Sequence, residues 1–195
     1  MDGMQPLSNP TLDAIWQRRS VRNFKPDQIA DEALAVVLEA AVLAPSAMNQ
    51  QKWFFTVVQN RLVLEEMNRI VKENKKRSQI SYFVRDIEGE GYHSYYHAPT
   101  VVVVSAEKGA AFVAIDCGAA LQNMALAAQS LGIGSCIMGS GEFLFQSPQG
   151  QHLKGVLAIP SGYEHVCTVA LGYNCNTCAE PVAPPRNRGV FHYIR

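Results

Sequence analysis

The stretch Thr100-Val101-Val102-Val103-Val104-Ser105 is the strongest indication of the fold in this chain of 195 residues. Four successive valines suit a β-strand that is covered on both faces, because a strand with one wet face alternates apolar and polar residues. The run Ala110 to Leu131 follows closely, is rich in alanine and is apolar on nearly every side. Such a helix is expected to be buried, either in the centre of the protein or at a subunit interface.

Helix-like and strand-like segments alternate on both sides of this stretch. They predict one mixed α/β domain over residues 1–195, with enough apolar residues, 48%, for one substantial core. Apolar residues recur at helical spacing in three further segments. The first ends near Arg19, the second ends at Pro45, and the third runs from Val63 to Val71. Strands are expected at four places, the last one short: Trp53–Gln59, Ser135–Met138, Val166–Leu171 and Phe191–Ile194.

Three shorter features are interpreted as local structure. The basic residues after Val71 predict a solvated helix face, and the polar and aromatic segment Ile80–Tyr96 predicts a loop or short helices. Gly132-Ile133-Gly134 is typical of a helix C-cap turn, and no Gly-x-Gly-x-x-Gly follows the first strand, which disfavours a dinucleotide-binding domain. The basic residues in question are Lys72, Lys75, Lys76 and Arg77.

Composition excludes several classes of protein. The 17 basic and 17 acidic residues balance, so we expect no nucleic-acid or membrane partner. The N-terminus lacks the pattern of a secretory signal, and five cysteines are an odd number in a chain that is not small. Both observations favour a reducing, cytoplasmic setting. Cys175 and Cys178 have the spacing of half a metal site or of a redox dithiol. A zinc site would need two more ligands, for which His165 and Cys167 are the only nearby pair, so we expect a surface loop and no metal.

Two segments carry the groups that could bind an anion or a planar ligand. Arg18-Arg19-Ser20-Val21-Arg22 lies where the first helix should end, and guanidinium groups with a serine hydroxyl suit a phosphate. Basic residues also cap helix C-termini, so this alternative stays open. Ala44-Pro45-Ser46-Ala47-Met48-Asn49-Gln50-Gln51 offers small and amide side chains after a helix stopped by proline, or is only a connecting loop.

Together with other motifs, these segments resemble the nitroreductase family of FMN enzymes. The motifs follow one another in the family's order over nearly the whole chain, and that succession is specific to the family but not to one substrate. They are Arg18-Arg19-Ser20-Val21-Arg22-Asn23-Phe24, Ala44-Pro45-Ser46-Ala47-Met48-Asn49-Gln50-Gln51-Lys52-Trp53, Ala98-Pro99, Asp116-Cys117-Gly118-Ala119-Ala120-Leu121-Gln122-Asn123, Leu131-Gly132-Ile133-Gly134-Ser135-Cys136, Ile159-Pro160-Ser161-Gly162, Ala170-Leu171-Gly172-Tyr173 and Pro185-Arg186.

The resemblance implies an α+β fold with a central, mainly antiparallel sheet flanked by helices, in an intertwined homodimer that binds two FMN molecules at its interface. It also implies a role for each part of the site. Arg18, Arg19 and Ser20 would hold the FMN phosphate and ribityl chain with help from Arg186 and Arg188, and Arg22 would lie near N1 and O2 of the ring. From the other subunit would come Pro45, Ser46, Ala47, Asn49 and Gln51, while the backbone of Cys136, Ile137, Met138 and Gly139 would approach N5.

The implied activity is transfer of hydride from NADH or NADPH through FMN to a nitroaromatic, quinone or related small acceptor, by a ping-pong mechanism. The cofactor would do the chemistry, so no catalytic side chain is implied. Two departures weaken parts of the match: Ala47 stands where many relatives have serine, and Lys52 replaces a proline. Tyr92, His93, Tyr95 and Tyr96 either line the substrate face or pack on the core. A flavin carrier or sensor, a dehalogenase and a dihydropteridine reductase remain alternatives.

Overall fold

A four-stranded antiparallel sheet in the order β1-β2-β4-β3 forms the centre of the protein. The computed structural model describes residues 7–78, 87, 89, 91–175 and 183–195. The elements in chain order are α1 (Pro10–Gln17), α2 (Asp31–Val42), the 3-10 turn η1 (Ala47–Asn49), β1 (Trp53–Val58), α3 (Arg61–Arg77), β2 (Thr100–Glu107), α5 (Val113–Ser130), β3 (Gly134–Met138), the 3-10 segment η2 (Gly139–Phe145), α6 (Pro148–Val156) and β4 (Tyr163–Gly172). The expected α+β class with an antiparallel sheet is confirmed.

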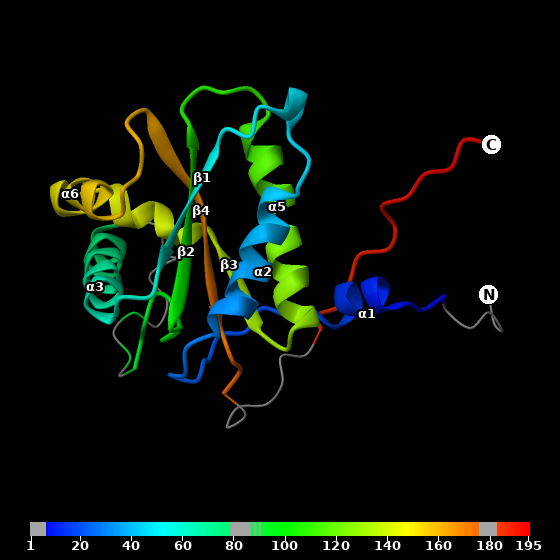
Figure 1. The fold of residues 1–195 in the computed structure, drawn as a ribbon, viewed down its shortest axis with the longest axis horizontal. Helices are drawn as coiled ribbons and strands as arrows, with labels where there is room; N and C mark the ends of the chain where they lie inside the picture. Colours follow the sequence, from blue (N-terminus) through cyan, green and yellow to red (C-terminus); the bar gives the residue numbers. More distant parts are fainter. Residues whose placement is uncertain (1–6, 79–86, 88, 90, 176–182) are drawn as a thin grey trace.

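The sheet is the middle of three layers (Figure 1). Helices α2 and α5 pack together on one face, and α3, η2 and α6 cover the other. The four valines of β2 explain why both faces need cover. Val101 and Val103 lie in the core on the α3 side, whereas Val102 and Val104 lie in the core on the α5 side, because successive side chains of a strand point to opposite faces.

Helix α5 ends in a turn that aims β3 back into the sheet. Gly132 has a left-handed φ of 70°, and its N–H bonds to the Gln129 carbonyl at 3.1 Å. The N–H of Ile133 bonds to the Ala128 carbonyl at 2.8 Å, which completes a Schellman motif. The C-cap expected at Gly132 is therefore confirmed, and the buried Ile133 leads directly into β3.

Within one protomer, the alanine-rich helix is buried on one face only. That face of α5 packs on the sheet and on α2, with Cys117, Ala120 and Met124 fully buried. The other face is open: Ile115 is 71% exposed, and Phe112, the residue before the helix, is 65% exposed. Central burial thus holds for the inner face, and burial of the open face at a subunit interface stays a prediction.

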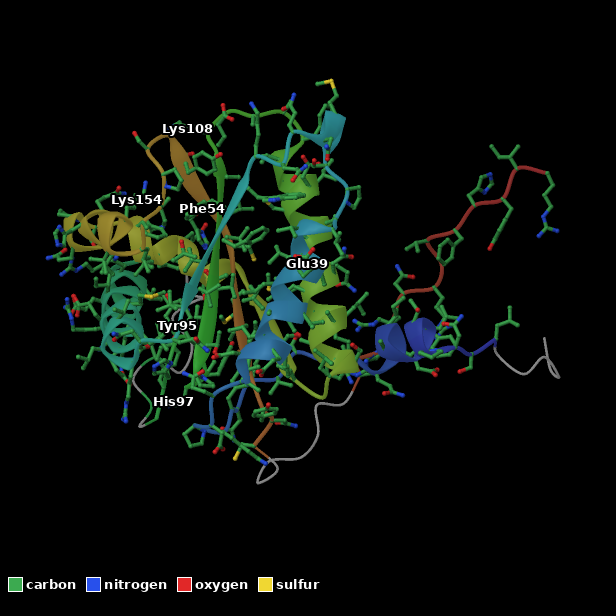
Figure 2. The ribbon with its side chains drawn as sticks, in the orientation of Figure 1. Glu39, Phe54, Tyr95, His97, Lys108 and Lys154 are labelled. Carbon is green, nitrogen blue, oxygen red and sulfur yellow. The ribbon has the colours of Figure 1, made fainter. Side chains whose placement is uncertain are left out.

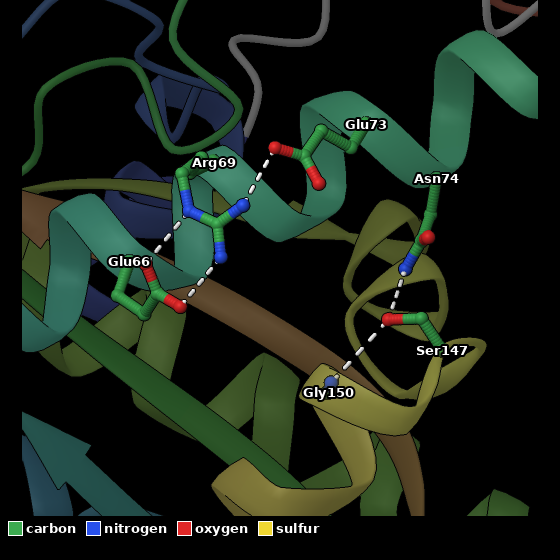
Figure 3. A network of polar contacts seen from close by, with 6 residues as sticks. All are labelled: Glu66, Arg69, Glu73, Asn74, Ser147 and Gly150. Atoms are coloured by element: carbon green, nitrogen blue, oxygen red, sulfur yellow. Dashed lines mark hydrogen bonds and ion pairs between the residues drawn. The ribbon is translucent and has the colours of Figure 1, made fainter.

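Helix α3 is tied to η2 and α6 by polar contacts (Figure 3). The Asn74 amide donates to the Phe143 carbonyl at 2.7 Å and to the Ser147 hydroxyl at 3.1 Å, and that hydroxyl accepts the Gly150 N–H at 3.3 Å as the N-cap of α6. Figure 3 also shows Arg69 between Glu66 and Glu73 on the outer side of α3. Helix α6 was not predicted from the sequence, although Ser147-Pro148 is a usual helix start.

Two smaller expectations are also corrected. Lys75 does not lie on a solvated face: it is 7% exposed, because it follows Val71 by one helical turn, and its Nζ donates to the Tyr92 hydroxyl at 3.0 Å. Residues 191–194 form no strand but belong to a tail that runs away from the body (Figure 1), with Phe191 and Ile194 exposed. The described helices include none with the length and hydropathy of a membrane span.

Candidate active site

The arginine segment lies along the first residues of β3. After α1 ends, Ser20 forms a parallel bridge with Ser135, and the Val21 N–H donates to the Ser135 carbonyl at 3.0 Å. Val21 is buried in the core, while its neighbours Ser20 and Arg22 point the other way along an extended chain. This pairing brings the segment 18–22 close to Cys136, the residue that follows Ser135 on β3.

Arg22, Arg18 and Ser20 all lie near enough to the Cys136 thiol to influence its pKa. Burial raises the pKa of this thiol, and the guanidinium charges of Arg22 and Arg18 act in the opposite direction, as does a hydrogen bond with the Ser20 hydroxyl. Two cations and a hydroxyl donor therefore converge at the start of β3. A donor set of this kind suits an anionic group such as a phosphate or the negative ring of a reduced flavin.

Arg19 has a different position in the protomer. Its Nη1 donates to the carbonyl of Trp16 at 2.6 Å and to that of Arg18 at 2.8 Å. It thus caps the C-terminus of α1, which is the alternative that the sequence left open for this cluster. Whether a second face of the guanidinium also meets a phosphate stays a prediction.

Tyr96 stands against Arg22, and the sequence analysis did not include it among the binding residues. Burial raises the pKa of its hydroxyl, as does the neighbouring Cys136, whereas a hydrogen bond from Arg22 opposes the shift. Tyr96 is only partly buried, unlike Tyr95, which is 1% exposed and lies between α3 and the sheet (Figure 2). Of the two alternatives for this aromatic segment, packing on the core holds for Tyr95, and proximity to the site holds for Tyr96.

A tight turn built on His93 presents Tyr96. The Nδ1 atom of His93 accepts the N–H groups of Tyr95 at 3.1 Å and of His97 at 3.2 Å, so the ring is held in the tautomer protonated at Nε2. Tyr96 and His97 have left-handed φ values of 56° and 57°. Such backbone costs about 1–3 kcal/mol per residue and is concentrated at functional sites. No sequence pattern signals it, since neither residue is glycine or asparagine.

The second predicted segment, residues 45–51, forms a strained and exposed loop. Met48, Asn49 and Gln51 all have left-handed φ values, of 51°, 54° and 50°. The Ser46 hydroxyl accepts the Gln51 N–H at 3.1 Å, and the Asn49 side-chain oxygen accepts the Gln51 amide at 2.9 Å. Both carboxylate oxygens of Asp116 lie 3.2 Å from the Ala47 nitrogen, whose N–H they accept. The loop is thus fastened to the first turns of α5.

The two segments lie at opposite ends of α5 within one protomer. The 45–51 loop is attached near the start of the helix through Asp116, whereas Ser20 pairs with Ser135 just beyond its end. The helix has 18 residues and is therefore about 27 Å long at 1.5 Å per residue. Residues that the sequence assigns to one site are therefore not brought together within one protomer.

The end of β3 continues the wall begun by the arginine segment. Cys136 and Met138 are buried, Ile137 is 37% exposed, and Gly139 is exposed where the chain enters η2. The Met138 carbonyl accepts a hydrogen bond from the Cys167 thiol at 3.3 Å, which fixes the backbone at this point. Cys136, Ile137 and Met138 lie on the same strand as Ser135, which pairs with the segment 18–22, and Gly139 follows directly.

Arg186 and Arg188 lie in the exposed tail 183–195, which passes α1 and runs away from the body of the protein (Figure 1). Their contribution to the phosphate site stays a prediction. Cys178 lies outside the described residues, so the pair Cys175 and Cys178 is not placed. Within the described ranges, no three His, Cys, Asp or Glu side chains are arranged to hold a metal ion.

Comparison with known proteins identifies the scaffold. The model of the nitroreductase family matches residues 15–173, which is most of the chain. The chain belongs to the nitroreductase family. This nitroreductase family member superposes with a TM-score of 0.88 on a nitroreductase with bound FMN from Bacteroides fragilis, at 34% identity over 96% of this chain and 100% of the other. A nitroreductase with bound FMN from Desulfitobacterium hafniense gives 0.87, at 33% identity over 97% and 100%.

Relatives of this nitroreductase family member differ in the reaction for which they are named. A protein of Archaeoglobus fulgidus, provisionally named as an NADH dehydrogenase/NAD(P)H nitroreductase, is 34% identical over 83% of this chain and 84% of its own length. More distant relatives are a 4-nitrobenzoate reductase of a Nocardioides species, at 28% identity, and an iodotyrosine deiodinase of Thermotoga neapolitana, at 26%. The family is therefore shared by more than one reductive reaction.

Proposed function

We propose that two copies of this chain form a homodimer with two FMN sites at the interface, and that the dimer is an oxidoreductase. Each site would combine the segment 18–22 and the strand β3 of one protomer with the 45–51 loop of the other. The observation that carries the proposal is the separation of these two segments by the length of α5. A second copy is the simplest way to bring them together, since a twofold axis supplies both halves to both sites.

The exposed apolar residues support the dimer. Trp16 on α1 is 46% exposed and Ile115 on α5 is 71% exposed, and α1 contacts α5. In the tail, Phe191 and Ile194 are 72% and 93% exposed. Apolar side chains exposed to this extent would be covered in such a dimer. The tail would then lie on the partner and bring Arg186 and Arg188 to the phosphate.

The residues of the site fit FMN in their charge and in their reach. The phosphate end would be bound by Arg18 and Ser20. Arg19 would join them through the N–H groups that do not cap α1, and Arg22 would lie beside N1 and O2 of the ring. FMN, when bound, supplies hydride transfer at N5. The backbone of Met138 and Gly139 would border that atom, and the Arg22 charge would stabilise the reduced ring. Tyr96 would keep the Arg22 guanidinium in place through its hydroxyl.

The reaction that this arrangement supports best is a ping-pong transfer. NADH or NADPH would bind over the ring, deliver hydride and leave, and a nitroaromatic, quinone or related small acceptor would then occupy the same place. Support comes from the family and from relatives named for NAD(P)H and nitroaromatic reduction. An open, flat site beside a flavin discriminates weakly between acceptors. We place this activity in the cytoplasm, in keeping with the buried thiols Cys117 and Cys136.

The decisive experiment is purification followed by flavin analysis. The protein should be yellow or take up added FMN, and heat should release FMN rather than FAD. Anaerobic NADH or NADPH should bleach the flavin, and an acceptor should restore its colour. Protein that binds no FMN refutes the proposal, and protein that binds FMN but is bleached by neither nicotinamide is a carrier instead.

A variant tests the phosphate assignment separately. Arg18→Ala should weaken FMN binding about 10- to 100-fold, because a charge-assisted hydrogen bond contributes about 1.5–3 kcal/mol. Arg69→Ala on α3 is the matched control, since Arg69 pairs with Glu66 and Glu73 and lies on the outer side of that helix. Equal affinities for Arg18→Ala and wild type would show that the phosphate lies elsewhere.

A further inference from the structure

Asp116 is a buried carboxylate that touches the 45–51 loop and no other described part of the proposed site. It is 7% exposed and belongs to the first turns of α5. Both of its oxygens lie 3.2 Å from the Ala47 nitrogen, so the Ala47 N–H is shared between them. Within the described residues, this N–H is its single hydrogen-bond donor. A buried carboxylate is costly to desolvate, and this one has few partners that would stabilise the fold alone.

The loop beyond Ala47 is not held by packing of its own side chains. Met48 is 86% exposed, and Asn49, Gln50 and Gln51 are exposed as well. Three of these four residues have left-handed backbone that a free loop would avoid. Strained backbone persists only where neighbouring contacts enforce it. The hydrogen bond from Ala47 to Asp116 is partly buried, whereas those from Gln51 to Ser46 and Asn49 are exposed, and α5 is a rigid support for it.

The geometry points to Asp116 as a positioning residue. We propose that its carboxylate, by holding the Ala47 N–H, sets the conformation in which Pro45, Ser46 and Asn49 reach the FMN site of the partner protomer. This inference rests on the proposed function. It assigns a role to Asp116, which lies on α5 and outside the 45–51 loop. Asp116 would not touch the cofactor and would act only through the loop.

The chain offers a double-mutant cycle for this contact. Asp116→Ala removes the acceptor, and Ala47→Pro removes the donor. Proline is compatible with this position because Ser46 before it is extended, with φ −133° and ψ 149°, and Ala47 starts a 3-10 turn. Asp116→Asn keeps one acceptor oxygen and should rescue most of the effect. Asn123→Ala is the matched control: it removes a hydrogen bond of 3.1 Å from α5 to the Ala40 carbonyl that does not involve the loop.

Two measurements are made on each full-length variant. FMN titration should show affinity weakened on the order of tenfold in Asp116→Ala and in Ala47→Pro, with the double variant no weaker than the poorer single one. Amide hydrogen exchange on FMN-free protein should show faster exchange at residues 47 and 49–51 in Asp116→Ala and unchanged exchange in α2. Asn123→Ala should match wild type in FMN affinity and in exchange at the loop.

The outcomes separate this inference from the function on which it rests. Unchanged exchange at the loop in Asp116→Ala overturns the anchoring, and faster exchange with unchanged FMN affinity overturns the positioning role. Additive losses of affinity in the double variant also overturn it, since the two substitutions would then act independently. If wild-type protein binds no FMN, the proposed function fails, and the exchange data still decide whether Asp116 holds the loop.

Discussion

Ser20 and Ser135 form a parallel β-bridge, and the glycine before Ser135 makes that pairing possible. A Cβ atom on Gly134 would lie 2.8 Å from Val21 Cγ2 and 3.1 Å from the Gly172 carbonyl oxygen. Contacts that short are not tolerated, so only glycine lets the arginine segment lie against β3 while Val21 enters the core. A residue without a side chain thus decides where Arg18 and Arg22 stand.

Gly134→Ala should therefore lower stability and weaken FMN binding together. Overpacking of this kind costs about 1–3 kcal/mol, and the displaced segment carries the proposed phosphate ligands. Urea unfolding and FMN titration measure the two effects. Adding Val21→Ala should restore part of the FMN affinity, since it removes the nearest clashing atom, Val21 Cγ2. Gly155→Ala on α6, where a Cβ would meet nothing within 4 Å, is the control and should be neutral or slightly stabilising.

Much of the fold could be predicted because its physical signals are local. The valine run of β2, the helical spacing of α2 and α3, and the glycine turn after α5 each reflect a period or a backbone requirement that a few adjacent residues carry. The burial of Lys75 depends on which side of α3 meets η2, which adjacent residues do not reveal. The sequence left two alternatives for α5, because an apolar helix face looks the same in a sequence whether a core or a partner covers it.

The sequence named the segments of the proposed site, but not the contacts that support them. Arg18, Ser20 and Arg22 lie near Cys136, and the 45–51 loop is exposed; their binding of FMN stays a prediction. Tyr96 and Asp116 were not assigned roles, because their contacts join segments far apart in the chain. Arg19 was given a phosphate role, and in the protomer its guanidinium caps α1. Left-handed backbone at non-glycine residues has no signature in sequence.

Arg22→Ala should lower the midpoint potential of bound FMN. A cation beside the ring stabilises the reduced, negatively charged form, and its loss should shift the potential by about 30–60 mV, which corresponds to about 1.5–3 kcal/mol for two electrons. Spectroelectrochemical titration measures this shift. Arg22→Lys keeps a charge and should recover most of it, while Arg69→Ala should match wild type. A potential that does not change in Arg22→Ala would place the guanidinium away from the ring.

Ile115→Asp should convert the dimer into monomers. Ile115 lies on the open face of α5, where a carboxylate would have to be buried without a partner in the proposed interface. Light scattering after size exclusion measures the mass, and FMN should be lost with the dimer because each site needs both protomers. Leu62→Asp is the control: Leu62 is 81% exposed on α3, across the sheet, and its replacement should leave the dimer intact. A dimer mass for Ile115→Asp, equal to that of Leu62→Asp, would exclude this face of α5 from the interface.

The stability of the protein should fall as the pH drops from about 6.5 to 4. Burial lowers the pKa of His165 to about 4, and burial together with the neighbouring His97 lowers that of His93 to about 4, against an ordinary value of 6.5. In this range the unfolded chain binds protons that the folded chain does not, so acid favours unfolding. Each histidine should lower the free energy of unfolding by on the order of 1–3 kcal/mol. This loss should be complete near pH 4 and absent above pH 7.

The geometry adds a reason in the case of His93: its Nδ1 already accepts two backbone N–H groups, which a proton on that nitrogen would displace. For His165, whose Nε2 lies 2.9 Å from the Thr168 hydroxyl, burial disfavours the charged form. Urea unfolding at fixed protein concentration, repeated between pH 7 and 4, gives the slope. His93→Asn keeps an acceptor for the turn and should flatten the slope, and His165→Gln should do the same. His192→Gln in the exposed tail is the control, and a slope that neither buried variant reduces would assign the pH dependence to the carboxylates.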